Sequence, residues 1–212
     1  MKKINLKILI VTSLVCLSTI ILGVYFYNQL PENVAIHFDI QNNPDNYFPK
    51  AMFVFGMPVI MTIFQIFACV VNDLSDKHKE ANKKASTVFK WFIPIVTVIL
   101  YIVTISFALG NKLDIRKIVM LMLGVMFIIM GNYLPKTKGS TYVHFGRKIK
   151  DEKLLNQASK ISGYIMIING ILAMISTLFN PIISVALVIA IILEGIILTI
   201  YLYTKVEKKG EQ

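Results

Sequence analysis

Six long blocks of apolar residues constrain the fold of this 212-residue chain more than any other feature of its sequence. Each block is close to the roughly 20 residues that a helix needs to cross a bilayer. Only 16% of the residues are charged, whereas a soluble protein carries about a quarter. Backbone polar groups in lipid must be paired within the spanning structure, so such blocks are expected to be helices. We therefore predict an all-α, polytopic integral membrane protein with six transmembrane helices, near residues 6–28, 51–71, 90–109, 117–134, 160–179 and 182–203.

The distribution of Lys and Arg predicts the orientation of these helices. Of the 22 basic residues, 18 fall in the segments that share a side with the N-terminus, and only four fall in the other connections. Basic residues gather on the cytoplasmic side of membrane proteins, so both termini are predicted to be cytoplasmic. The net charge of +10 is then explained by orientation and by contact with anionic lipids. We expect no direct binding of nucleic acid.

The polar segment 29–50 is extracytoplasmic in this topology and contains candidate metal ligands. His37, Asp39 and Asp45 are residue types that bind zinc or manganese. One interpretation is therefore a metallohydrolase site in this loop. The other is a loop folded against the helix ends, in which His37 and Asp39 bond backbone groups. The loop offers no fourth ligand and no helical zinc motif, so we predict no metal and no cofactor.

The stretch LPENVAIHFDIQNNPDNYFPK also resembles a small domain at the N-terminus of many bacterial membrane proteins. That domain has a Leu-Pro step, a His-Phe-Asp segment, a Pro-Asp turn and an aromatic-x-Lys sequence between two helices. Asparagine stands here where the domain usually has glycine before its turn, and asparagine also tolerates a left-handed backbone. The matching residues are Leu30, Pro31, His37, Phe38, Asp39, Pro44, Asp45 and Lys50.

A second resemblance follows the fourth apolar block, in MGNYLPKTKGSTYVHFGRKIK and the helix after it. This part is similar to the SdpI immunity family, which has a Gly-Asn-aromatic-hydrophobic-Pro-Lys segment followed by a Gly-x-Arg loop. The family's Trp is missing from this region, and Ser159 stands where His is expected. The residues that fit are Gly131, Asn132, Tyr133, Leu134, Pro135, Lys136, Lys138, Arg147 and Gly163, with Lys160 in the place of an Arg.

The resemblance implies a multi-pass immunity protein of the bacterial cytoplasmic membrane that protects its producer from a secreted antimicrobial peptide. It also implies, as a second partner, a small cytoplasmic transcriptional repressor that the protein sequesters. The outer loop is mildly acidic, which suits a cationic peptide toxin. The candidate toxin-facing residues are Pro31, His37, Phe38, Asp39, Pro44 and Asp45. The candidate inner-face residues are Gly131, Asn132, Pro135, Lys136, Arg147 and Gly163.

The inner loop 135–159 is the expected docking place for such a repressor. It is rich in Lys and Arg, and its default role is topology and contact with membrane lipids. A protein partner also needs exposed apolar side chains to cover. Tyr142, Val143 and Phe145 offer such a patch beside Arg147.

Glu194 lies within the sixth apolar block, and it supports an alternative function. An ionised carboxylate inside a bilayer is unfavourable by several kcal/mol, so intramembrane acids are candidates for functional sites. One interpretation is a small proton-linked transporter centred on Glu194. The other is a neutral hydrogen bond between helices, with Asn169 and Gln65 as candidate partners.

By motif content the chain divides into a two-helix domain at 1–75 with its outer loop 29–50, a cytoplasmic linker at 76–89, and an SdpI-like four-helix domain at 90–212. Neither part contains a phosphate-binding loop or an arrangement of nucleophile and base. We therefore predict that the protein is not an enzyme.

Overall fold

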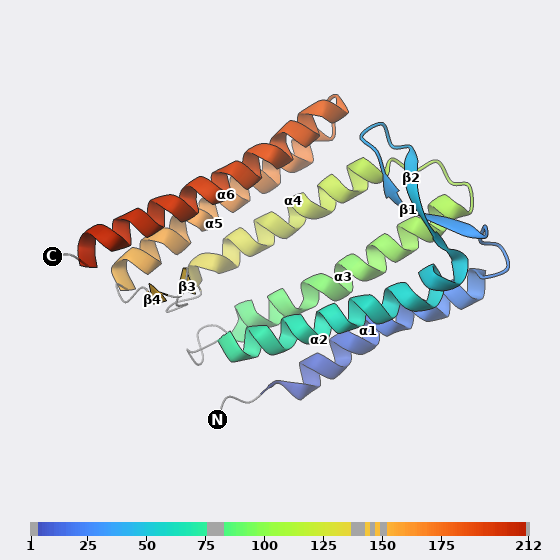
Figure 1. Ribbon diagram of the computed structural model, residues 1–212, viewed down its shortest axis with the longest axis horizontal. Coiled ribbons are helices and arrows are strands. Elements are labelled where there is room, and N and C mark those ends of the chain that lie inside the picture. Colours follow the sequence, from blue (N-terminus) through green and yellow to red (C-terminus); the bar gives the residue numbers. More distant parts are fainter. Residues whose placement is uncertain (1–3, 76–82, 137–142, 145–146, 149–151, 211–212) are drawn as a thin grey trace. The chain divides into compact units, whose positions relative to one another are not determined.

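The computed structural model describes residues 4–75, 83–136, 143–144, 147–148 and 152–210, and these are mostly helical. Six of the described helices are long and apolar enough to cross a membrane (Figure 1). The prediction of an all-α, multi-pass membrane protein is therefore confirmed. The helices are α1 (Leu6–Phe26), the short π-helix η1 (Met52–Gly56) that continues into α2 (Met57–Ser75), α3 (Lys83–Ala108), α4 (Ile115–Tyr133), α5 (Glu152–Ser176) and α6 (Pro181–Gly210).

The chain forms two compact units. Unit 1 comprises Met1–Asp76 and Ser86–Ile118, and unit 2 comprises Lys77–Ala85 and Val119–Gln212. Most of α3 therefore packs with α1 and α2, whereas the division by motif content groups residues 90–109 with the C-terminal helices. The first turn of α4 belongs to unit 1, and the rest of α4 belongs to unit 2.

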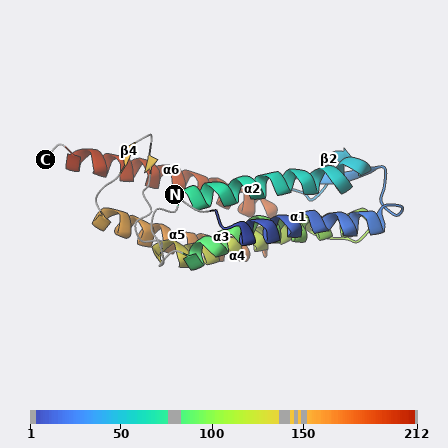
Figure 2. The same cartoon turned by 90° about the horizontal axis from the view of Figure 1, so that it is seen from below.

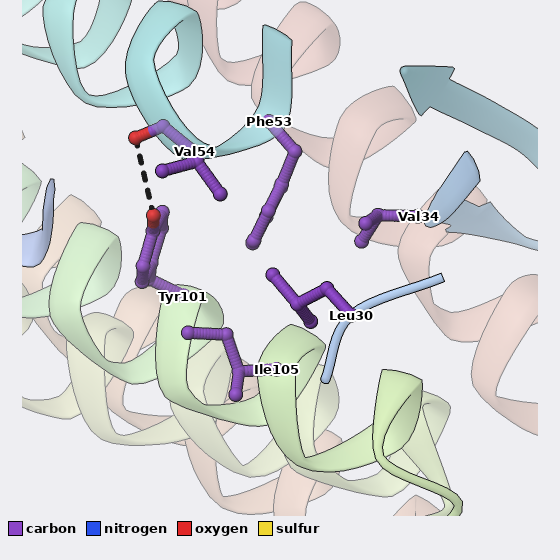
Figure 3. Packing of buried hydrophobic residues seen from close by; sticks show 6 residues of the cluster. All are labelled: Leu30, Val34, Phe53, Val54, Tyr101 and Ile105. Carbon is purple, nitrogen blue, oxygen red and sulfur yellow. Dashed lines mark hydrogen bonds between the residues drawn. The ribbon is translucent and has the colours of Figure 1, made fainter. Parts of the chain in front are cut away.

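The segment that the sequence suggested as an outer loop is a β hairpin. Strands β1 (Asn33–Phe38) and β2 (Pro44–Pro49) pair antiparallel, with register shifts on either side of His37. The hairpin lies at one end of α1 and α2 in both views (Figures 1 and 2). One face of it contributes to the buried core of unit 1, together with residues of η1 and α3 (Figure 3). This core comprises Leu30, Val34, Phe53, Val54, Tyr101 and Ile105.

A proline inside α3 leaves an unpaired carbonyl group, and a buried glutamine of α2 bonds to it. Pro94 has no N–H, so the carbonyl of Lys90, four residues earlier, lacks its usual helical partner. The Gln65 Nε2 donates to that carbonyl at 2.8 Å, and it also donates to the Thr12 hydroxyl of α1 at 2.8 Å. Gln65 is fully buried. This single amide therefore links α1, α2 and α3 where lipid offers no other partner.

A tyrosine of α3 bonds to a carbonyl of the π-helical turn η1, close to Pro58 of α2. The carbonyl of Val54 lies four residues before Pro58, in η1. The Tyr101 hydroxyl donates to it at 3.2 Å, and the Tyr101 ring stacks on the ring of Phe53 (Figure 3). In both places a side chain of another helix bonds a carbonyl that lies four residues before a proline, and a proline has no N–H to donate.

Unit 2 contains the antiparallel hairpin of α5 and α6. The two helices are joined through Asn180 and Pro181: the Asn180 side chain accepts a hydrogen bond from the Ile182 N–H, and Pro181 is the first residue of α6. Proline suits this position because its missing N–H would have no partner in the helix. The buried hydroxyls of Ser176 and Ser184 meet at 3.1 Å near the same end.

Candidate functional site

The hairpin of unit 1 presents a polar outward face opposite the face that joins the core. Val34 and Phe48 pack with the core, whereas His37, Asp45 and Tyr47 are exposed by 67%, 46% and 48%. His37 Nδ1 lies 2.5 Å from the Asp45 carboxylate, so the two side chains form a pair across the strands. We call His37, Asp45 and Tyr47 the outward face. It combines a carboxylate, an imidazole and an aromatic ring on a structured support.

Asp39 organises the turn between the strands. Its carboxylate accepts hydrogen bonds from the backbone N–H groups of Gln41 and Asn43 at 2.9 and 2.8 Å, and from the Asn43 side chain at 3.2 Å. The bond from the Asn43 N–H is the main reason that the pKa of Asp39 lies below its ordinary value. The expectation that Asp39 bonds backbone groups is confirmed. The same expectation for His37 is wrong, because the His37 imidazole bonds the Asp45 carboxylate. Asp39 supports the turn, while His37 and Asp45 bond to each other.

Asn42 connects this turn to α4. Its backbone is left-handed, with φ of 68°, a conformation that asparagine tolerates. The Asn42 Oδ1 accepts a hydrogen bond from the N–H of Ile115 at 2.7 Å, and its Nδ2 donates to the carbonyl of Leu113 at 2.9 Å. Ile115 is the first residue of α4, where backbone N–H groups have no helical partner. Asn42 therefore caps α4 from a position 73 residues away.

The remaining motif residues of the hairpin fix its attachment to the helices. Lys50 forms an ion pair with Glu32 at 2.9 Å and lies over the Tyr27 ring. Phe38 stacks edge-on against Phe107 of α3 at 4.7 Å between ring centroids. Pro31 is exposed and Pro44 is half-buried, at the start of β2.

The inner-face motif residues Gly131, Gly163 and Pro135 lie together in unit 2. A β carbon added to Gly131 would stand 2.5 Å from the carbonyl oxygen of Gly163, and one added to Gly163 would stand 2.7 Å from Pro135. Gly124 and Gly170 meet in the same way seven residues along each helix. These glycines therefore allow the backbones of α4 and α5 to approach closely. In contrast, a β carbon on Gly195 would meet nothing within 4 Å.

Of three further inner-face residues, only Asn132 has a described side chain. Asn132 is exposed on α4. Lys136 lies in the short 3-10 helix η2 (Leu134–Lys136), and Arg147 lies in strand β4 (Arg147–Lys148), which pairs with β3 (Val143–His144). The side chains of Lys136 and Arg147 lie outside the described residues. So do Tyr142 and Phe145, the candidate docking residues for a repressor.

Glu194 of α6 is bonded to α5. The Asn169 Nδ2 donates to its carboxylate at 2.6 Å, and Asn169 is buried. This confirms Asn169 as a partner. Gln65, the other candidate, bonds instead to Thr12 and Lys90 within unit 1.

A buried ion pair that was not predicted from the sequence lies at the N-terminal end of α1. The ammonium group of Lys90, only 4% exposed, contacts the Asp73 carboxylate, whose other oxygen accepts the N–H of Asn5 at 3.0 Å. The pair therefore joins α2, α3 and the residue that caps α1. The sequence feature that could have indicated this ion pair is the spacing of Gln65, Cys69 and Asp73. Residues four apart in a helix lie on the same side of it, here one side of α2.

Within the described part of the chain, no three His, Cys, Asp or Glu residues are grouped so that they could hold a metal ion. The outward face provides two such groups, His37 and Asp45, and Asp39 is occupied by its turn. The arrangement is suited to binding a polar or cationic partner on a firm surface. It does not supply the ligands that a catalytic zinc needs.

A known family model matches the part of unit 1 that contains the outward face. The fold and the outward face define a multi-pass membrane protein with an extramembrane hairpin between its first two helices. Residues 14–62 match the family model described as "Domain of unknown function (DUF1648)". The match spans most of α1, the whole hairpin and the start of α2. No curated protein matches the chain. No solved structure matches it either.

Proposed function

We propose that this protein is an immunity protein of the bacterial cytoplasmic membrane, and that it protects its producer by binding a secreted antimicrobial peptide. The observation that carries this proposal is the outward face of the hairpin. His37, Asp45 and Tyr47 are exposed, while the opposite face of the same strands is anchored in the core of unit 1. A preformed surface loses little conformational entropy on binding, which favours affinity.

The chemistry of this face suits a cationic, partly aromatic or apolar peptide. Asp45 offers a carboxylate whose present partner, His37, is itself exposed, so an Arg or Lys of a peptide can approach it. Tyr47 adds an aromatic ring, the side-chain type that most often anchors interfaces. Asp39 contributes through the turn it holds, because its oxygens already accept three hydrogen bonds.

The experiment is a survival assay in a toxin-sensitive bacterial strain that expresses this chain. The toxin to be tested is the product of a toxin-precursor gene sought beside this one. The wild type is expected to raise survival, and Asp45→Asn combined with Tyr47→Ala is expected to lower it by about tenfold or more, as for interface anchors. Tyr25→Ala is the matched control, because Tyr25 is an exposed tyrosine of α1 outside the hairpin. Unchanged survival with the wild type correctly inserted in the membrane would exclude the immunity role.

A cytoplasmic repressor is the second partner that we propose, at the inner loop 135–159. The loop is rich in Lys and Arg, and Tyr142, Val143 and Phe145 supply apolar side chains for a partner to cover. Replacement of Tyr142 and Phe145 by Ser is expected to abolish recruitment of the repressor to the membrane and to leave resistance intact. Loss of resistance alone would contradict this assignment.

A small proton-linked transporter centred on Glu194 is the alternative function. The observation in its favour is the hydrogen bond between Asn169 and a carboxylate inside a membrane-spanning helix. The same bond is also explained if Glu194 serves only the packing of α5 against α6, because polar side chains stabilise helix pairs in lipid.

A further inference from the structure

The connection between the hairpin turn and α4 depends on Asn42 in a way that the proposed peptide binding does not require. Asn42 makes no contribution to the outward face. Its side-chain amide instead makes two hydrogen bonds to the backbone of the α3–α4 connection, at Leu113 and Ile115. A bidentate amide fixes both distance and orientation, so the turn and the first turn of α4 are held as one piece.

The turn itself is held by a different residue. The Asp39 carboxylate bonds the N–H groups of Gln41 and Asn43, and the Asp39 carbonyl accepts the N–H of Asn42. Asn42 is therefore placed in its left-handed conformation by Asp39, and its side chain then reaches Ile115. The conformation of Asn42 therefore depends on Asp39, and the capping of α4 depends on Asn42.

The α4 end of the connection has its own local cap as well. The Asp114 side chain accepts the N–H of Lys117 at 3.0 Å, and the Asp114 carbonyl accepts the N–H of Ile118. The N–H of Ile115 is left to Asn42. The first turn of α4 is thus satisfied partly by its own sequence and partly by the hairpin.

We propose that Asn42 is a latch that couples the conformation of the hairpin turn to the first turn of α4. A ligand that loosens or tightens the turn then changes how firmly the first turn of α4 is ordered, and α4, like α3, contributes residues to both units. The coupling stands on the geometry of the turn alone. Only its use in reporting a bound peptide rests on the proposed function.

The test is hydrogen–deuterium exchange of the full chain in lipid nanodiscs, without any added peptide, read in the segment 113–118. Asn42→Gly removes the latch but keeps the turn, because glycine adopts positive φ without strain. Asp39→Ala loosens the turn at its source. We expect Asn42→Gly to speed exchange in 113–118 by about five- to tenfold, as for loss of one or two hydrogen bonds.

The double variant decides whether Asn42 carries the coupling. Asp39→Ala is expected to speed exchange in 113–118 when Asn42 is present and to add nothing when Asn42 is glycine. The proposal is overturned if Asp39→Ala loosens the turn and leaves 113–118 unchanged. It is equally overturned if Asp39→Ala has the same effect in the Asn42→Gly background. Exchange in the middle of α2 monitors the fold, and Asp39→Asn serves as a milder change if Asp39→Ala fails to fold. Because no toxin is used, failure of the immunity role leaves this result unaffected.

Discussion

Gln65 shows how much one buried amide can decide inside a membrane protein. It compensates for the donor that Pro94 lacks, and it holds Thr12 of α1 at the same point. Removal of the amide leaves the carbonyl of Lys90 unpaired in an apolar environment, which is more costly than the loss of an exposed hydrogen bond. The compensation of Pro94 by Gln65 can therefore be tested by changing both residues, alone and together.

Gln65→Leu is expected to lower the free energy of unfolding by about 1–3 kcal/mol, the usual range for a buried polar group without a partner. Pro94→Ala supplies a helical N–H for the carbonyl of Lys90 and should restore much of this loss in the double variant. The measurement is thermal or denaturant unfolding in detergent, arranged as a double-mutant cycle. Simple additivity of the two changes would contradict the assignment.

Asp39 gives the hairpin turn a defined response to acid. Its pKa lies below the ordinary value of 3.8, chiefly because the Asn43 N–H bonds the ionised carboxylate. A lowered pKa in the folded state means that the stabilisation is complete above the ordinary value and is lost as the pH falls through the lowered pKa. We expect hydrogen exchange at Asn43, corrected for its intrinsic pH dependence, to rise only below about pH 4. Asp39→Asn should remove this transition, and a transition near neutral pH would point to another group.

At the scale of elements, the α4–α5 pair depends on glycines that face each other. Gly124 with Gly170, and Gly131 with Gly163, repeat at seven residues, which is two helical turns. This spacing is present in the sequence, but its meaning depends on which helices are neighbours. Two of the four glycines, Gly131 and Gly163, belong to the inner-face motif. Close packing of α4 and α5 is enough to explain why glycine stands at these two motif positions.

Gly131→Ala is expected to destabilise the α4–α5 pair, because the new methyl group would lie 2.5 Å from the Gly163 carbonyl oxygen. Forced separation of packed helices typically lowers stability by about 1–3 kcal/mol. Gly195→Ala is the matched control, since open space surrounds that position. The measurement is the thermal unfolding midpoint of each variant in detergent. Equal effects of the two substitutions would refute the close-packing role.

At the scale of the whole molecule, the chain is multi-pass, and its orientation is a prediction from charge. Gln41 lies in the exposed hairpin turn and Lys153 is exposed near the start of α5. Gln41→Cys should react with a membrane-impermeant maleimide on intact cells, and Lys153→Cys should react only after permeabilisation. The native Cys16 and Cys69 are buried, which keeps the background low. The reverse pattern of labelling would invert the topology and place the hairpin inside.

The role of Glu194 is also a question for the whole molecule. If Glu194 is a packing residue, Glu194→Gln should retain resistance and stability, because glutamine still accepts from Asn169. Glu194→Leu should then lower stability by about 1 kcal/mol, the usual size of such a bond in lipid. The measurement is survival together with proton uptake into liposomes that contain a pH-sensitive dye. Proton uptake that the wild type supports and Glu194→Gln abolishes would favour the transporter.

The sequence by itself determined the helices, because a bilayer accepts few alternatives for long apolar blocks. It also indicated that asparagine can hold a left-handed backbone before the Pro-Asp turn, and it predicted the bonding of Asp39 to backbone groups, since both depend on local chemistry. Only the tertiary structure decided that the outer segment pairs as a hairpin, that Asn42 reaches Ile115, and that Gln65 bonds to Lys90. These contacts join residues that are far apart in the chain. A one-dimensional pattern records the polarity and spacing of such residues, but their partners are fixed by how the helices pack.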